Sequence, residues 1–235
     1  MLLATGLVPV SADVCPPPQT EIRVSGAISA PSIDDSRSLD QLKAMNLKGT
    51  LPEGMKSADT VGITAATISV DSEIRTRNAG PANGPTCVWP SVVSVKLSSA
   101  PNIYVDSSHG KCRQDVATRH ELRHVEIDKD IIERYLPIFR ARLKAMTDAI
   151  GAVQIASPDD LPKARGRIEE KINAMLSVTY DMLASDRGQA QADFDSPAEY
   201  RRVSAACSGV SVDASTVPAA RPPSIGGRRS YTRLQ

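Results

Sequence analysis

The chain carries one apolar stripe with the spacing of an α-helix, and this stripe constrains the fold more than any other feature. It begins after about residue 115, and its members recur at steps of three and four residues, which places them on one helix face: Ile127, Ile131, Tyr135 and Ile138. His120 and His124 extend the same face, so we expect both imidazoles to point into the protein interior. Pro137 is predicted to kink this helix, and Gly151 marks its end.

Segments of β-character precede this helix. Strands are predicted at 21–25, 92–97 and 102–105, and the Val, Ile and Thr residues of 61–74 indicate further β-structure. We expect the strand at 102–105 to be an edge strand that could pair with an extended peptide.

Two further helices are predicted after it. A second periodic stretch covers about 163–193, and its shared face contains Ile168, Ile172, Met175, Thr179 and Met182. A short helix at 196–207 opens on Ser-Pro-Ala-Glu, which has the form of a capping box. Strands followed by helices predict an α+β fold, with a small N-terminal twisted β-sheet followed by long helices.

The domain organisation follows from the same pattern. We expect a single domain at 13–207, β-rich over 13–110 and helical over 111–207. Residues 208–235 are rich in Ser, Pro, Gly and Arg and are predicted to form a disordered tail. Residues 2–10 are apolar and precede a small-residue Val-Ser-Ala site, so 1–12 is interpreted as a signal-peptide remnant. No positive n-region is present, and a merely apolar or truncated start is the alternative.

Four widely spaced cysteines indicate the compartment. None forms a C-x-x-C pair, which a thiolate zinc site would use, so two long-range disulfides are the better interpretation. Three pairings are open, and we favour Cys15–Cys87 and Cys112–Cys207. Disulfides predict an oxidising, secreted or periplasmic location; buried free thiols are the alternative.

Composition excludes several classes of function. The chain has 28 Lys and Arg against 27 Asp and Glu, so we expect no nucleic-acid partner bound through bulk charge. Aromatic residues make up only 3%, which argues against stacking on bases or sugars. No apolar run reaches the roughly 18 residues of a membrane span, so no integral membrane segment is expected.

The predicted interior face of the first helix contains an H-E-x-x-H motif. His120 and His124 lie one turn apart and can bind one Zn²⁺, while Glu121 is placed to take a proton from a metal-bound water. Chance matches to this short pattern are common in unrelated helices. Here two of only three histidines fall within it, at the start of a long helix that follows β-structure.

The third metal ligand is less evident. An extended motif would need Gly at 127 and His at 130, where the chain has Ile127 and Asp130. The last histidine, His109, lies in a predicted loop and is interpreted as a solvated turn residue. We therefore expect a carboxylate on the second long helix: Asp186, which continues its apolar face, with Asp181 as the alternative.

The segment 102–207 resembles a bacterial family of predicted secreted zinc-dependent proteases. The matching pieces are Ile-Tyr-Val at 103–105, the Cys112 region, the histidine motif at 120–127, Tyr-Asp at 180–181, and Asp-Ser-Pro-Ala-Glu-Tyr at 195–200 with Cys207. Related sequences often carry a His-Gly pair after Tyr-Asp, whereas this chain has Asp186 and Arg187 in that stretch. The resemblance implies a zincin-like metallopeptidase.

The first hypothesis for function is an exported zinc metallopeptidase that acts on a peptide or protein substrate. Zinc would lower the pKa of its bound water to about 7, and Glu121 would act as general base and then protonate the leaving amine. The second is a catalytically inactive, zincin-like secreted or envelope binding protein, suggested by the missing His-Gly pair. The third is a purely structural domain in which the histidine pair is coincidental.

Overall fold

The structure is a computed structural model that describes residues 15, 18–46, 61–80 and 85–207. The interpreted signal-peptide remnant at 1–12 and the tail at 208–235 lie outside the described residues. Among the residues described, no helix is both long and apolar enough to span a membrane.

Most strands precede the two long helices, so the fold is a mixed α and β fold of the expected α+β kind. The elements, in chain order, are β1 (Glu21–Ile28), β2 (Ser32–Arg37), α1 (Leu39–Asn46), β3 (Gly62–Ala65), β4 (Ile68–Ala79), β5 (Thr86–Ser99), β6 (Asn102–Asp106), α2 (Lys111–Ile150), β7 (Val153–Ile155), the 3₁₀ turn η1 (Pro158–Asp160), α3 (Leu161–Phe194) and α4 (Pro197–Ala205). The helix α2 runs through Pro137 as one element of 40 residues.

The strands form two sheets, where a single small sheet was expected. The first has the order β1-β5-β4, and β7 pairs with the beginning of β5. The second has the order β2-β6-β3. The expectation of an edge strand at 102–105 is wrong, because β6 is the central strand and has β2 and β3 on its two sides. A peptide has no free edge of β6 with which to pair.

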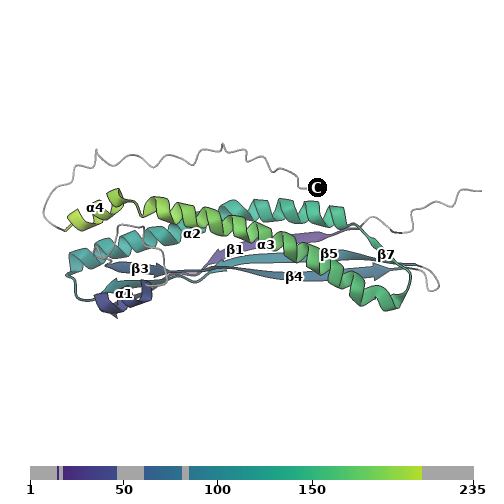
Figure 1. The fold of residues 1–235 in the computed structure, drawn as a ribbon, viewed down its shortest axis with the longest axis horizontal. Helices are drawn as coiled ribbons and strands as arrows, with labels where there is room; N and C mark the ends of the chain where they lie inside the picture. The colour runs from purple at the N-terminus through teal and green to yellow at the C-terminus, as the bar shows by residue number, and fades with distance from the viewer. Residues whose placement is uncertain (1–14, 16–17, 47–60, 81–84, 208–235) are drawn as a thin grey trace, which may run out of the picture.

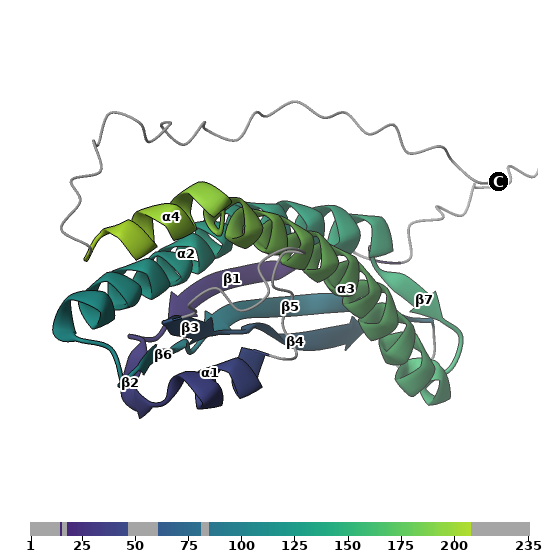
Figure 2. The ribbon, with the colours of Figure 1, turned by 60° about the vertical axis from the view of Figure 1, so that its left-hand side comes forward.

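The long helices cover one side of the sheets, and α1 lies on the other side of the three-stranded sheet (Figures 1 and 2). On β5, alternate residues point towards these helices, as the two-residue period of a strand requires: Val93, Val95 and Leu97 are buried. Of the predicted stripe on α2, Ile127, Ile131 and Tyr135 are buried in this core and Ile138 is only partly buried. The buried face continues instead through Phe139 and Leu143. Burial of these apolar side chains on both layers holds α2 and α3 onto the sheet.

The face of α3 that meets α2 differs from the predicted one after Thr179. Leu183 is 1% exposed, whereas Met182, which the sequence analysis placed on this face, is 36% exposed. The buried face of α3 then continues through Arg187 and Gln191, whose side chains reach residues of α2.

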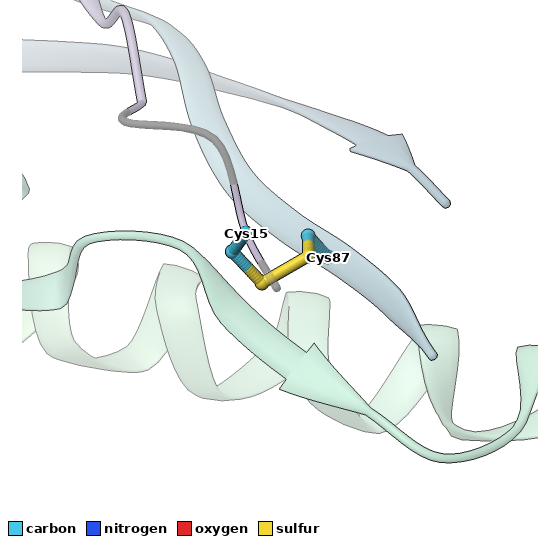
Figure 3. The surroundings of a disulfide bond; sticks show 2 residues. All are labelled: Cys15 and Cys87. Carbon is cyan, nitrogen blue, oxygen red and sulfur yellow. A yellow bond between two sulfur atoms is a disulfide. The ribbon is translucent and has the colours of Figure 1, made fainter. Parts of the chain in front are cut away.

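Two disulfides join distant parts of the chain, with the pairing favoured from the sequence. Cys15 is bonded to Cys87 on β5 (Figure 3), and Cys112 at the start of α2 is bonded to Cys207, beyond α4. The described residues contain no free cysteine. Two disulfides fit an extracellular or periplasmic protein, since they persist in oxidising compartments.

Candidate metal centre

The two histidines of the motif face each other near the start of α2. Their side chains lie one helical turn apart, and the two Nε2 atoms are 3.3 Å from each other. Both are largely shielded from solvent, with side-chain exposures of 8% for His120 and 11% for His124. Phe194 stacks on the ring of His120 at a centroid distance of 4.8 Å and meets His124 edge-on. The pair therefore lies against the end of α3.

Asp195 brings a carboxylate to this pair. It is the residue that caps the C-terminus of α3, and its Oδ1 lies 3.2 Å from Nε2 of His120 and 3.1 Å from Nε2 of His124. This oxygen is buried and has no hydrogen-bond partner among the described residues. Two imidazole nitrogens and one carboxylate oxygen thus form a nearly equilateral triangle.

The other nitrogen of each ring has an acceptor as its partner. Nδ1 of His120 lies 3.1 Å from the Glu199 carboxylate on α4, and Nδ1 of His124 contacts the side-chain oxygen of Gln191. Both Nδ1 atoms must therefore donate. In the neutral rings, each Nε2 then has a free lone pair. The two Nε2 atoms and Asp195 Oδ1 can therefore face one common position.

The charges at this point favour a bound cation or bound protons. Burial acts to lower the pKa of both histidines, but the nearby carboxylates of Asp195 and Glu121 outweigh it and raise the pKa of each. Burial opposes the charge on Asp195 as well, yet the contacts with His120 and His124 bring the pKa of that carboxyl to about 2. Asp195 is therefore ionised at neutral pH, and a divalent cation would compete with protons for the imidazole nitrogens.

The triangle has the dimensions of one face of a zinc coordination tetrahedron. Ligand atoms about 2.0–2.1 Å from a tetrahedral zinc ion lie about 3.3–3.4 Å from one another, close to the 3.1–3.3 Å separations between these three atoms. Metal-binding histidines also donate their second ring N–H to a carboxylate or carbonyl oxygen, as both do here. The residues present therefore fit a zinc ion held by His120, His124 and Asp195.

Glu121, the acid inside the motif, faces the three-stranded sheet. Its side chain is buried, and Oε2 accepts a hydrogen bond of 2.8 Å from the hydroxyl of Thr64 on β3. Gly62 on the same strand leaves room for it, since a Cβ there would lie 2.9 Å from Cγ of Glu121. Burial raises the pKa of Glu121, while the two imidazoles act in the opposite direction. A carboxylate with a raised pKa is suited to proton transfer near neutral pH.

The structure does not bring the predicted third ligand, Asp186, to the histidines. Its carboxylate accepts a hydrogen bond of 2.9 Å from the hydroxyl of Tyr135, and the alternative, Asp181, is solvent-exposed. Asp186 meets α2 at Tyr135, whereas Arg187 meets it at Asp128, one turn from His124. Tyr135 also lies three turns beyond His124 on α2, about 16 Å along the axis.

Asp195 and Glu199 are the functional residues that the spacing argument missed. Because α3 runs back along α2, residues at about the same distance from the connecting turn become neighbours, as Gln191 and His124 do. Such a count would have directed the search to the end of α3. Ser196 caps α4 by accepting a hydrogen bond from the Glu199 amide, as the capping pattern predicted, but the Glu199 side chain binds His120.

The remaining histidine does not take part in this group. Nδ1 of His109 lies 2.6 Å from Asp106 in the turn between β6 and α2, where Ser108 binds the same carboxylate. It is half-buried and paired, where a solvated turn residue was expected.

No family model, curated protein or solved structure matches the chain.

Proposed function

We propose that the protein is an exported zinc-dependent hydrolase of the metallopeptidase kind, with the metal held by His120, His124 and Asp195. The triangle formed by the two Nε2 atoms and Asp195 Oδ1 carries this proposal, because three lone pairs converge there and the carboxylate oxygen has no hydrogen-bond partner among the described residues. The resemblance of the histidine motif to secreted zinc-dependent proteases supports the reaction class. The two disulfides support export.

The residues around the metal position divide the chemistry between them. When bound, zinc supplies Lewis acidity and lowers the pKa of water at the site. Glu121 is the proton acceptor in this proposal: its pKa is raised by burial, and Thr64 holds its carboxylate in one orientation. Once protonated, Glu121 can return the proton to the leaving amine. Glu199 and Gln191 orient the two imidazoles.

Metal analysis of the purified protein tests the metal centre. We expect one zinc ion per chain after dialysis against a zinc-containing buffer, and loss of that zinc in His120→Ala. His109→Ala is the matched control, because His109 binds Asp106 instead of this group. Substoichiometric zinc in the wild-type protein would overturn the metal centre, and with it the proposed reaction.

Peptide hydrolysis tests turnover separately. We expect cleavage of a mixed peptide library by the zinc-loaded wild-type protein and a decrease of at least about 100-fold in Glu121→Gln, which keeps the side-chain shape but removes the base. The Gln variant should bind zinc with unchanged stoichiometry. Equal cleavage by both proteins would exclude Glu121 as the base.

A second candidate function is a secreted binding protein that keeps the metal without turnover. The observation that favours it is the environment of Glu121, whose carboxylate is buried and already hydrogen-bonded to Thr64. Two open hollows of about 650 and 330 Å³ lie over the sheets, and no residue of the histidine site lines either of them. Stoichiometric zinc without cleavage of any library peptide would select this function over the enzyme.

A further inference from the structure

Behind His124, a chain of hydrogen bonds connects α3 to a buried acid on α2. Arg187 donates to both oxygens of Asp128, at 2.6 and 2.9 Å, and Asp128 is only 1% exposed. The side-chain nitrogen of Gln191 donates to the same carboxylate at 2.7 Å and to the backbone oxygen of His124 at 3.1 Å. The side-chain oxygen of Gln191 contacts Nδ1 of His124.

These contacts allow only one orientation of the Gln191 amide. The Asp128 carboxylate and the His124 carbonyl can only accept hydrogen bonds, so the NH₂ group must face them. A reversed amide would place its oxygen against these two acceptors, and both would lose the hydrogen bond from Gln191. The oxygen of Gln191 therefore faces Nδ1 of His124, which has to carry a proton.

Each of the two histidines is linked, directly or through one side chain, to an acid that is paired with an arginine. Glu199 contacts His120 directly and binds Arg202 at 2.5 and 2.7 Å. Asp128, paired with Arg187, acts on His124 through the amide of Gln191. Arg187 also donates to the backbone oxygen of Ala66, which lies between β3 and β4, and this contact ties the chain to the sheet layer.

We propose that Gln191, Asp128 and Arg187 are positioning residues that commit His124 to the Nδ1–H tautomer and so leave its Nε2 free to bind a metal ion. In this assignment, Asp128 determines the direction of the amide, and Gln191 transmits that direction to the imidazole. Arg187 provides the positive charge that is paired with the buried Asp128 carboxylate. The inference rests on the proposed metal centre for its function, but the tautomer itself belongs to the metal-free protein.

Asp128→Asn is the decisive variant, since it is nearly isosteric. The amide nitrogen of the new residue can donate to Gln191, so that only the His124 carbonyl still opposes a reversed Gln191 amide that presents its NH₂ group to Nδ1 of His124. Nδ1 would then accept, and the proton would move to Nε2, the atom needed by the metal.

Nitrogen-15 NMR of the metal-free protein measures the tautomer directly, at a pH where the shifts show neutral rings. We expect His124 to be protonated at Nδ1 in the wild-type protein and at Nε2 in Asp128→Asn. Zinc affinity, measured by chelator competition, should fall about 10–100-fold in this variant. An Nε2–H tautomer in the wild-type protein, or an unchanged Nδ1–H tautomer in the variant, would overturn the inference.

A second pair of variants covers the case in which Asp128→Asn does not fold. Gln191→Met removes the acceptor of the Nδ1 proton and should also lower zinc affinity about 10–100-fold. Gln189→Met is the matched control, because Gln189 is exposed and donates to Asp193 on the same helix. Equal zinc affinity in these two variants would overturn the role of Gln191. If the wild-type protein binds no zinc, the proposed function fails, while the tautomer measurement still tests this inference.

Discussion

Oδ1 of Asp195 lies 3.1 Å from Nε2 of His124, at the point where α3 ends beside the beginning of α2. The two residues meet because α3 runs back along α2, from the connection at 151–160 as far as the histidines. This contact, and the equivalent one to His120, makes the end of α3 part of the candidate metal centre.

Substitution of Asp195 should therefore weaken zinc binding strongly, whereas substitution of Asp186 should leave it unchanged. We expect Asp195→Asn to weaken zinc binding by more than about 100-fold, because loss of a ligand exceeds the loss of an outer hydrogen bond. Asp186→Asn is the matched control, since its carboxylate binds Tyr135. Chelator competition measures the zinc affinity of both variants. If Asp186→Asn lost more affinity than Asp195→Asn, Asp186 and not Asp195 would be the third ligand.

The two disulfides should differ in their effect on the metal centre. Removal of either, as a double Cys→Ala variant, should lower the free energy of unfolding by up to about 4–5 kcal/mol, since the bonds span 72 and 95 residues. Only loss of Cys112–Cys207 should also weaken zinc binding. It anchors the end of α4, which has no buried residue of its own and carries Glu199.

Denaturant unfolding and zinc titration of both double variants check this prediction. The Cys15–Cys87 variant is the control for a general loss of stability. An equal loss of zinc affinity in both would contradict a local role for the bond at α4.

Asp106 should make stability depend on pH in the acid range. Burial opposes its charge, but hydrogen bonds from Ser108 and the contact with His109 outweigh this and lower the pKa of Asp106. A lowered pKa means that the stabilisation is present above the unfolded-state pKa of about 3.9 and is lost as the pH falls through the folded-state value. Asp106→Asn should be less stable than wild type by about 1–3 kcal/mol at pH 7, and this difference should narrow below about pH 4.

Urea unfolding at pH 7, 5 and 3 measures the difference in free energy. Asp130→Asn, an exposed position on α2, is the control and should change stability by less than about 0.5 kcal/mol. A difference at Asp106 that stayed constant down to pH 3 would show that its charge does not contribute.

Two glycines should respond in opposite directions to substitution by alanine. A Cβ at Gly26 on β1 would lie 2.5 Å from Cγ2 of Ile132 on α2, so Gly26→Ala should destabilise the packing of helix on sheet by about 1–3 kcal/mol. Gly166 on α3 has nothing within 4 Å of such a Cβ. Gly166→Ala should therefore stabilise the helix by up to about 1 kcal/mol. Thermal unfolding of both variants tests the packing of α2 against β1.

Local patterns were sufficient to predict α2, α3, α4, several of the strands and two of the three candidate metal ligands, but not α1. The three- and four-residue spacing of α2 placed His120 and His124 on one largely shielded face, because side-chain direction along a helix depends only on the number of residues between positions. The segment 92–97 was likewise predicted as a strand, and its alternate residues Val93, Val95 and Leu97 are buried in the structure. The Ser-Pro-Ala-Glu pattern marked the start of α4.

The third candidate ligand, Asp195, depended on how elements pack. Leu183 rather than Met182 faces the core, a rotation of one residue that the mixed pattern of α3 left open. Asp186 meets α2 at Tyr135, about three turns beyond His124. The role of β6 as a central strand was equally undetermined, since strand order depends on contacts between distant segments. Asp195 became a candidate ligand only because α2 and α3 are antiparallel and of similar length, so that the end of α3 lies beside the histidines of α2. Helix periodicity within one segment contains no information on which residues of two helices become neighbours.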